Sequence, residues 1–300
     1  MILSVGEILV DMIGAEKDGV FCYERKAGGA PFNVACAAAK IGAKSAFVGC
    51  VGDDTVGNFL EKFVAERGLA HAYVKKDTTV NTTLAFVELD KSGERSFCFY
   101  RKNTADYRLP EIPSELFDEA TIVHIGSLML SEKQGEEYAL CLAQRAKSAG
   151  KLVSFDVNFR DDIFRDTCAA VAVYKKLIEA ADIVKFSEDE TEIFSEAFVE
   201  SLTDKLVCIS LGANGSRWQY QGKTKSVESI SVKPVDTTGA GDAFYAGVLS
   251  KIDGTPRKEW TEELFDYAFR FGNICGALNT QGRGAIDALP DEKTVQSYLK

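Results

Sequence analysis

Short β-rich runs alternate with helix-like runs along most of this 300-residue chain. Continuous apolar runs bounded by turn residues predict buried strands at 2–12, 45–52, 121–127, 151–159, 181–187 and 205–212. Amphipathic or alanine-rich runs that stop at glycine predict helices at 31–42, 55–68 and 132–150. This alternation is typical of a parallel sheet with helices on both faces. We therefore expect an α/β fold, built as a three-layer α/β/α sandwich.

Two stretches interrupt the alternation. Residues 12–29 form an irregular excursion, and within 82–103 two β-rich runs at 82–89 and 95–101 flank the turn-like segment 90–94. We expect a small second sheet here that acts as a flap over a site, as a subunit contact, or as both. No proline-rich or glycine/serine-rich linker marks a second domain, so residues 1–300 are expected to form one domain that carries this lid.

Composition excludes several classes of function. The net charge of −10 argues against binding of nucleic acid through a general positive field. No apolar run approaches the roughly 20 residues needed to span a bilayer, and Glu7 and Asp11 interrupt the N-terminal run, so we expect a cytoplasmic protein without a membrane partner. The eight scattered cysteines predict free thiols rather than disulfides or a cysteine-based metal site.

Acid–base chemistry is expected to fall to carboxylates, because the chain has only two histidines and His124 lies in an apolar run typical of a protein core. The segment VDTTGAGDAFYAGVL (235–249) places Asp242 at the start of an apolar helix, after a strand-like approach at 232–235. Backbone amides at a helix start lack partners and favour anions, so the Gly239–Gly241 turn predicts an anion hole. Alternatively, Asp242 only caps the helix and the glycines only make a tight turn.

The string DTTGAGDAF (236–244) closely resembles the second signature of the ribokinase-like sugar kinases, the PfkB superfamily. AGGAPFNVACAAAKIG (27–42) resembles the first signature. The resemblance implies a ribokinase-like sandwich with a β-sheet lid and transfer of the γ-phosphoryl group of ATP to a sugar. It also implies that Asp242 is the general base and that the amides of Gly239, Ala240 and Gly241 neutralise charge on the phosphoryl group.

On the sugar side, the resemblance implies that Gly28 and Gly29 allow close approach of the substrate and that Asn33 and Asp11 bind its hydroxyls. FYRKNTAD (99–106) and DVNFRDDIF (156–164) resemble fructokinase segments. In those relatives the arginines matching Arg101 and Arg160 approach the substrate. Both arginines are also compatible with surface ion pairs.

On the nucleotide side, the resemblance implies an ATP site that comprises Ser187, Glu190, Ser210, Gly212, Gly215, Gly239, Gly241 and Asn273. KFSEDE (185–190) departs from the family's NxxE motif, because Ser187 occupies the asparagine position. Glu190 would organise Mg²⁺ indirectly, but SEDE is equally typical of a helix cap. A K⁺ site beside the anion hole is implied around Asp236, Thr238, Gly282 and Gly284.

Substrate choice remains open between D-fructose, 2-keto-3-deoxygluconate and another sugar of the ribokinase-like kinases. NTAD after Arg101 and the serine in KFSEDE favour D-fructose, phosphorylated at its 6-hydroxyl, whereas the arginine at position 160 is shared with 2-keto-3-deoxygluconate kinases. A catalytically silent sugar sensor is a further alternative, and a dinucleotide-binding oxidoreductase is disfavoured because no GxGxxG follows the first strand. Phe86, Phe97 and Phe99 alternate along the predicted lid and suggest a homodimer through paired lids.

Overall fold

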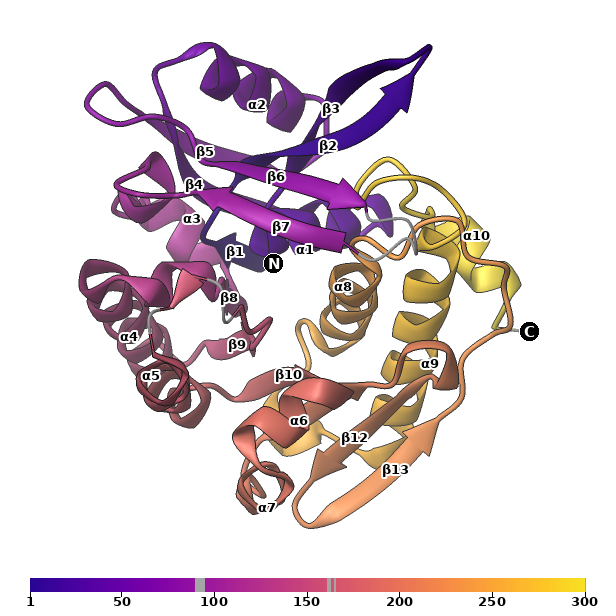
Figure 1. Cartoon of the computed structure of the whole chain (residues 1–300). Coiled ribbons are helices and arrows are strands. Elements are labelled where there is room, and N and C mark those ends of the chain that lie inside the picture. The colour runs from indigo at the N-terminus through magenta and orange to yellow at the C-terminus, as the bar shows by residue number, and fades with distance from the viewer. Residues whose placement is uncertain (90–94, 161–162, 165, 300) are drawn as a thin grey trace.

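A nine-stranded, mostly parallel sheet runs through the centre of the computed structural model, which describes residues 1–89, 95–160, 163–164 and 166–299 (Figure 1). Seven neighbouring strands pair in parallel, and the last two pair antiparallel at one edge. In order across the sheet, the strands are β13 (Lys223–Val227), β12 (Ser216–Tyr220), β11 (Leu206–Ser210), β10 (Ile183–Ser187), β9 (Leu152–Asp156), β8 (Ile122–Ile125), β1 (Ile2–Val5), β4 (Ser45–Gly52) and β5 (His71–Asp77).

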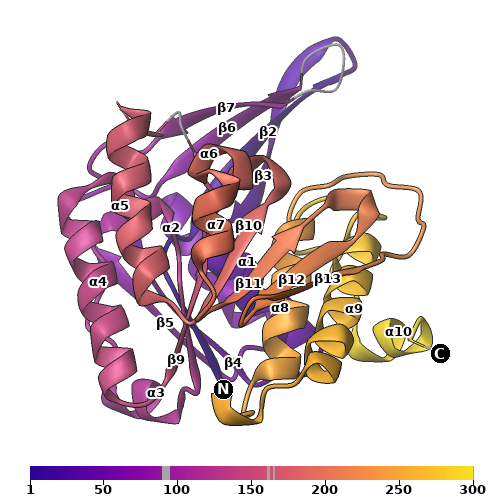
Figure 2. The same cartoon turned by 90° about the horizontal axis from the view of Figure 1, so that it is seen from below.

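Helices cover both faces of this sheet, each over its own apolar core (Figure 2). One face carries α1 (Ala30–Lys40), α2 (Thr55–Ala65), α8 (Ala240–Ile252), α9 (Glu262–Asn279) and α10 (Glu292–Ser297). The other face carries α3 (Ser114–Glu119), α4 (Lys133–Ser148), α5 (Thr167–Ala180), α6 (Glu188–Phe194) and α7 (Glu196–Ser201). Short 3₁₀ turns occur at Ala105–Tyr107, Leu128–Ser131, Gly212–Asn214 and Arg257–Glu259. The predicted three-layer sandwich is confirmed.

A second, four-stranded sheet stands off the first and is called the lid below. Its strand order is β3 (Val20–Gly28), β2 (Leu9–Lys17), β6 (Leu84–Leu89) and β7 (Arg95–Tyr100). The predicted turn at 90–94 lies outside the described residues. Ala85 pairs with Phe99 and Phe86 pairs with Cys98, so Phe86 and Phe99 point to opposite faces of the lid. The prediction of one face bearing Phe86, Phe97 and Phe99 is therefore wrong for Phe86, while the side chain of Phe97 is outside the described part.

The apolar run 2–12 was predicted as one strand, and it is two strands in different sheets. The chain leaves β1 at Gly6, where a Cβ atom would lie 2.8 Å from the Pro31 Cγ, and enters the lid at Leu9. The mostly apolar sequence conceals the crossing because β1 and the start of β2 are both buried. Asp11 consequently belongs to the lid rather than to the end of the first strand.

Polar strands and one loop also departed from the predictions. The edge strand β5 is mostly exposed and has no apolar run to reveal it, and β12 and β13 were likewise not predicted. The expected strand at 232–235 lies in a segment without regular structure, because Pro234 has no amide hydrogen to contribute to a ladder. Instead, Val235 N donates to Thr280 O at 2.7 Å.

Other expectations hold within the described residues. All eight cysteines are free thiols there, and none of the described helices has the length and apolar content needed to cross a membrane. His124 is a core residue: its Nδ1 lies 3.1 Å from Ser154 Oγ, and burial lowers its pKa to about 4. It is therefore uncharged at neutral pH, and its ring packs edge-on against Tyr245.

Glu7 lies at the crossing between the two sheets and is almost completely buried, with 1% of its surface exposed. Neither carboxyl oxygen has a hydrogen-bond partner in the described part of the chain. Burial raises the pKa of Glu7 to about 8, although the charge of Arg101 opposes the shift. The folded protein therefore holds a proton on Glu7 that the unfolded chain releases at lower pH.

We predict that Glu7→Gln removes a pH-dependent loss of stability. In the native chain the free energy of unfolding should fall as pH rises from about 4.5 to about 8, because only the unfolded state has released the Glu7 proton in that range. Relative to the native chain, the variant should gain up to about 1.4 kcal/mol per pH unit across this window. Urea unfolding between pH 5 and 9 measures the difference; a difference independent of pH would contradict the assignment.

Candidate active site

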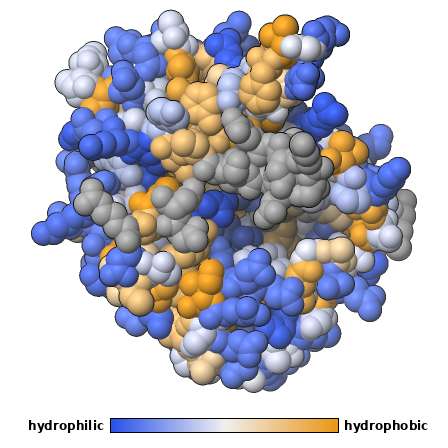
Figure 3. All heavy atoms as spheres, in the orientation of Figure 1, coloured by the Kyte–Doolittle hydropathy of each residue, from blue (hydrophilic) through white to orange (hydrophobic). Residues whose placement is uncertain are grey.

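A cleft of roughly 330 Å³ opens at the carboxyl ends of the parallel strands, between the lid and the start of α8. Ligands of open α/β sheets bind at this edge, because the strand ends and helix starts meet there. The surface is hollowed in this region and hydrophilic residues line the hollow (Figure 3). The lining includes five predicted sugar-side residues and two glycines of the predicted anion hole, namely Asp11, Gly29, Asn33, Arg160, Asp242, Gly239 and Gly241.

At the start of α8, the backbone packs closely against the segment that contains Ala285. Gly239 caps the helix in the left-handed conformation, at φ 73°, and a Cβ on it would lie 2.6 Å from the Ala285 Cβ. The amide of Ala240 donates to Thr237 O at 3.2 Å, so it is not free to bind an anion as predicted. Within the described residues, the amides of Gly239 and Gly241 have no protein acceptor. These two amides lie at the positive end of α8, where the anion hole is predicted, and the turn that holds them is called the anion-binding turn below. Anion binding there stays a prediction.

Asp242 follows this turn and is half-buried in the cleft. Its Oδ2 accepts a hydrogen bond of 2.8 Å from Asn33 Nδ2 on α1. Burial and the nearby Asp156 charge raise the pKa of Asp242 to about 6, against the lowering effects of Asn33, Lys185 and Arg160. The carboxylate is thus ionised at neutral pH but remains basic enough to accept a proton from a hydroxyl group.

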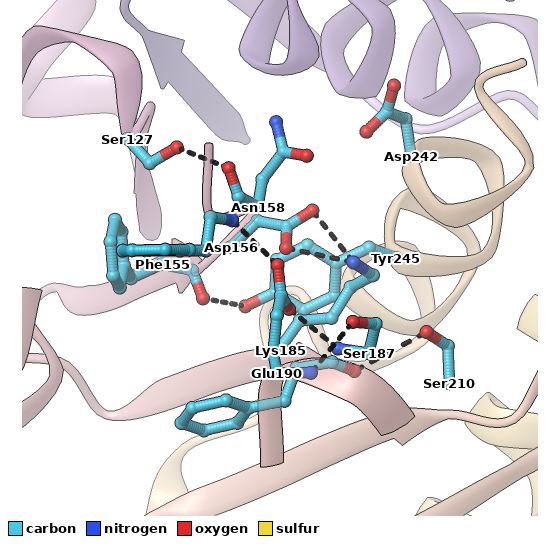
Figure 4. A network of polar contacts seen from close by, with 12 residues as sticks. Ser127, Phe155, Asp156, Asn158, Lys185, Ser187, Glu190, Ser210, Asp242 and Tyr245 are labelled. Carbon is cyan, nitrogen blue, oxygen red and sulfur yellow. Dashed lines mark hydrogen bonds and ion pairs between the residues drawn. The ribbon is translucent and has the colours of Figure 1, made fainter. Parts of the chain in front are cut away.

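Lys185 and Asp156 form a buried ion pair on the floor of the cleft, and sequence reasoning missed both (Figure 4). Lys185 Nζ lies 2.8 and 3.1 Å from the two Asp156 oxygens. Desolvation alone would lower the pKa of Lys185, but Asp156, Glu190 and Asp242 outweigh it and the net shift is upward. Lys185 is therefore a permanent cation, and its Nζ lies 3.5 Å from where a Cβ on Gly241 would be.

Glu190 and Ser187 form a capping box at the start of α6 (Figure 4). Ser187 N donates to Glu190 Oε2 at 2.7 Å, and Phe159 N donates to Oε1 at 2.6 Å. Burial raises the pKa of Glu190, while the Lys185 charge and these two amides oppose the shift. The cap interpretation therefore describes the free protein, and the roles of both residues toward ATP and magnesium remain predictions.

The glycines of the first signature serve the fold directly. A Cβ on Gly28 would lie 2.3 Å from Asp11 Oδ2, so this glycine makes room for that carboxylate, and its role toward the sugar stays a prediction. Gly29 has φ 113°, and its Cβ would lie 2.5 Å from Glu7 O. Asp11 and Arg160 both line the cleft, and Arg160 Nη1 donates to Phe159 O at 3.1 Å.

Arg101 does not line the cleft that holds Asp242. It lines an adjacent cavity of roughly 590 Å³, and Phe99 lies between the two because it borders both. Arg101 Nε donates to Asp106 Oδ2 at 2.5 Å, Nη1 donates to Ser131 Oγ at 2.8 Å, and only 3% of the side chain is exposed. The surface ion-pair interpretation is wrong for Arg101, since this pair is buried.

Four of the predicted nucleotide residues lie near β11, the β12–β13 hairpin or the chain that follows it, namely Ser210, Gly212, Gly215 and Asn273. Ser210 ends β11 and donates weakly to Phe186 O at 3.4 Å. A Cβ on Gly215 would lie 2.2 Å from Val227 O, and Asn273 Nδ2 donates to that same oxygen at 2.8 Å. Gly215 and Asn273 therefore support the chain at 227–228, whereas Gly212 has open space beside it. Their contacts with ATP stay predictions.

The two segments of the predicted cation site lie side by side. Asp236 joins them, because its Oδ1 accepts from Thr238 N and its Oδ2 from Gly284 N, each at 2.9 Å. Gly282 is required by packing, since its Cβ would lie 2.7 Å from the Ala288 Cβ. Across the described chain, no cluster of three or more His, Cys, Asp or Glu side chains forms a metal site. A monovalent ion held by carbonyls remains a prediction.

Comparison with known proteins places this geometry in a family. The profile described as pfkB family carbohydrate kinase matches residues 1–292. The chain belongs to this family. It is therefore a carbohydrate kinase, an enzyme that transfers a phosphoryl group to a sugar hydroxyl, and the predicted resemblance is confirmed.

Individual members of the family match over nearly their whole length. Probable fructokinase-5 of Arabidopsis thaliana is 37% identical, with 100% of this chain and 97% of the relative covered. The fructokinase of Xylella fastidiosa, solved with bound ATP, superposes with a TM-score of 0.93 at 31% identity, covering 99% of this chain and 97% of the other. The Vibrio cholerae O395 fructokinase, solved with fructose, ADP and calcium, has a TM-score of 0.88 at 31% identity, with 100% and 98% covered.

Proposed function

We propose that this carbohydrate kinase phosphorylates the 6-hydroxyl of D-fructose with ATP. The observation that carries the proposal is the position of Asp242, ionised above pH about 6, directly beside the free amides of the anion-binding turn. In the reaction a bond forms between the sugar oxygen and the γ-phosphorus, and the bond from that phosphorus to the β-phosphate oxygen breaks. The hydroxyl proton goes to Asp242, and ADP leaves.

Charge stabilisation in this scheme comes from the chain itself. The amides of Gly239 and Gly241 point from the positive end of α8, and Lys185 adds a buried positive charge next to Gly241. Phosphoryl transfer depends mainly on positioning and on preorganised charge. Their place beside Asp242 supports a site where the phosphoryl group lies between amides, ammonium and hydroxyl.

A neutral ketose fits the site better than a sugar acid. Arg101, one of the two arginines expected near substrate, is already neutralised by Asp106, which also accepts hydrogen bonds from Thr83 and Thr104. A carboxylate placed there would compete with a buried, fully paired Asp106. Arg160 remains in the cleft and is the group through which 2-keto-3-deoxygluconate would bind. The similarity to fructokinases supports fructose.

The residues present fit Mg²⁺–ATP. Magnesium is held mainly by phosphates and water, and both Glu190 oxygens already accept backbone amides, so Glu190 would act on the ion through water. Magnesium supplies charge neutralisation on the phosphates when bound. A K⁺ ion would bind near carbonyls of the segments that Asp236 joins, and a Vibrio cholerae fructokinase variant was solved with potassium.

A homodimer through the lid is part of the proposal. Tyr23, Phe86 and Tyr100 pack edge-to-face along one face of the lid, with centroid separations of 5.0 and 5.2 Å. Tyr100 and Phe21 remain 62% and 57% exposed. Such an aromatic surface on a thin sheet favours burial against a second copy.

Asp242→Asn should abolish most turnover. The native enzyme should lose kcat/KM tenfold per pH unit below about pH 6, because protonated Asp242 cannot accept the hydroxyl proton. The variant should lose about 10²- to 10⁴-fold in kcat while calorimetry shows sugar binding within a few-fold of native. A coupled ADP-release assay measures turnover, and near-normal turnover would exclude Asp242 as the base.

A substrate panel tests the sugar. ADP release with D-fructose, 2-keto-3-deoxygluconate, ribose, glucose and adenosine should give the highest kcat/KM for fructose. Preference for 2-keto-3-deoxygluconate would overturn the fructose assignment and point to Arg160 as a carboxylate ligand. Binding without turnover of any sugar would instead support the sensor alternative.

Tyr100→Glu should separate the proposed dimer, because it places a charge on the exposed aromatic face of the lid. Sedimentation velocity should show a dimer for the native chain and a monomer for the variant. Tyr73→Glu is the matched control, since Tyr73 is 40% exposed on β5 of the main sheet and should leave the dimer intact. A native monomer at micromolar concentration would contradict the proposal.

A further inference from the structure

Asn33 holds the proposed base from across the cleft. It lies in the first turn of α1, where its backbone amide donates to Gly29 O at 2.8 Å, and only 7% of its surface is exposed. Its Nδ2 donates to Asp242 Oδ2 at 2.8 Å, joining residues 209 positions apart in sequence. The family resemblance assigned Asn33 to sugar binding, and the structure adds this second contact.

The hydrogen bond from Asn33 makes the two carboxylate oxygens of Asp242 differ in their surroundings. Oδ2 of Asp242 is occupied by Asn33, whereas no hydrogen bond to another residue of the described chain involves Oδ1. The side-chain oxygen of Asn33, Oδ1, is buried and has no hydrogen-bond partner among the described residues. The side-chain amide of asparagine donates from its nitrogen and accepts at its oxygen. Asn33 can therefore donate to Asp242 through Nδ2 and still accept a hydrogen bond from a sugar hydroxyl through Oδ1.

We propose that Asn33 is a positioning residue: it fixes the carboxylate of Asp242 with Oδ1 turned to the substrate, and it keeps that carboxylate ionised. The inference rests on the proposed function, in which Asp242 is the base. A carboxylate that accepts a hydrogen bond from a neutral amide is stabilised in its charged form. Rotation of Asp242 about its side-chain bonds is also restricted, which keeps the proton-accepting oxygen in place.

The surrounding charges make this contact consequential. Desolvation and Asp156, at the end of β9, raise the pKa of Asp242. Asn33 on α1 opposes them, followed by Lys185 on β10 and by Arg160. Glu7, which also lines the cleft, adds a further negative charge only when its own proton is lost. Removal of the Asn33 amide should therefore raise the pKa of Asp242 further, because desolvation and Asp156 are then less opposed.

The test compares pH profiles of kcat/KM from pH 4.5 to 9 for the native enzyme, Asn33→Ala and Asn33→Asp. The acidic limb should move upward by about one pH unit in Asn33→Ala, as expected for loss of a hydrogen bond to a charged group. It should move further in Asn33→Asp, because two adjacent carboxylates cannot both ionise readily. The deficit in kcat should be larger at pH 6 than at pH 9.

Asn158→Gly is the matched control, since Asn158 lines the same cleft and has φ 37°, a conformation glycine tolerates. Loss of the Asn158 side chain should change KM for the sugar without moving the acidic limb of the pH profile. A limb that stays in place in Asn33→Ala, while melting curves show a folded variant, would overturn the inference. A purely structural or sugar-binding role predicts that unchanged limb.

A second readout separates this inference from the proposed function. Carbon-13 NMR of aspartate-labelled protein, with the Asp242 signal assigned from Asp242→Asn, follows ionisation of the carboxyl without any turnover. An upward midpoint in Asn33→Ala supports control of Asp242 by Asn33, and an unchanged midpoint overturns it. If Asp242→Asn keeps normal turnover, the base assignment fails, whereas the NMR midpoint still decides whether Asn33 governs the charge.

Discussion

The buried ion pair between Lys185 and Asp156 is the interaction on which the cleft depends. The two residues are neighbours in the β9–β10 register, so strand pairing alone brings them together. Both charges are buried, which costs each of them its hydration energy, and each is stabilised by the opposite charge of the other. Loss of either partner would leave an unpaired charge beneath Asp242, so the pair sets the electrostatic environment of the whole site.

Helix starts complete this environment from two directions. α8 brings Gly239, Gly241 and Asp242 to the cleft, and α1 brings Asn33. The two helices pack on the same face of the sheet, which explains how residues of two distant sequence motifs come within hydrogen-bond distance. The site is thus assembled by the layer architecture rather than by any single loop.

Sequence patterns predicted the sandwich, α1 and the glycine turn before Asp242, because periodicity and glycine placement are local properties. They did not reveal that 2–12 crosses between sheets, since both of its strands are equally apolar. Nor did they identify Lys185 and Asp156, which are 29 residues apart in sequence and pair because of the register between β9 and β10. A charged residue within each of two buried strands was the available signal. Asn33 was selected correctly for the cleft, but its contact with Asp242 required the packing of α1 against α8.

One glycine of each signature, together with Gly215 before β12, is required by packing before any ligand arrives. A side chain at Gly29 would meet the Glu7 carbonyl, one at Gly239 would meet Ala285, and one at Gly215 would meet Val227. A descendant of this chain that had given up catalysis would therefore still need all three in order to fold. Glycine motifs in such lineages record shared architecture, and the retention of enzymatic activity is better judged from the charged side chains at positions 156, 185 and 242.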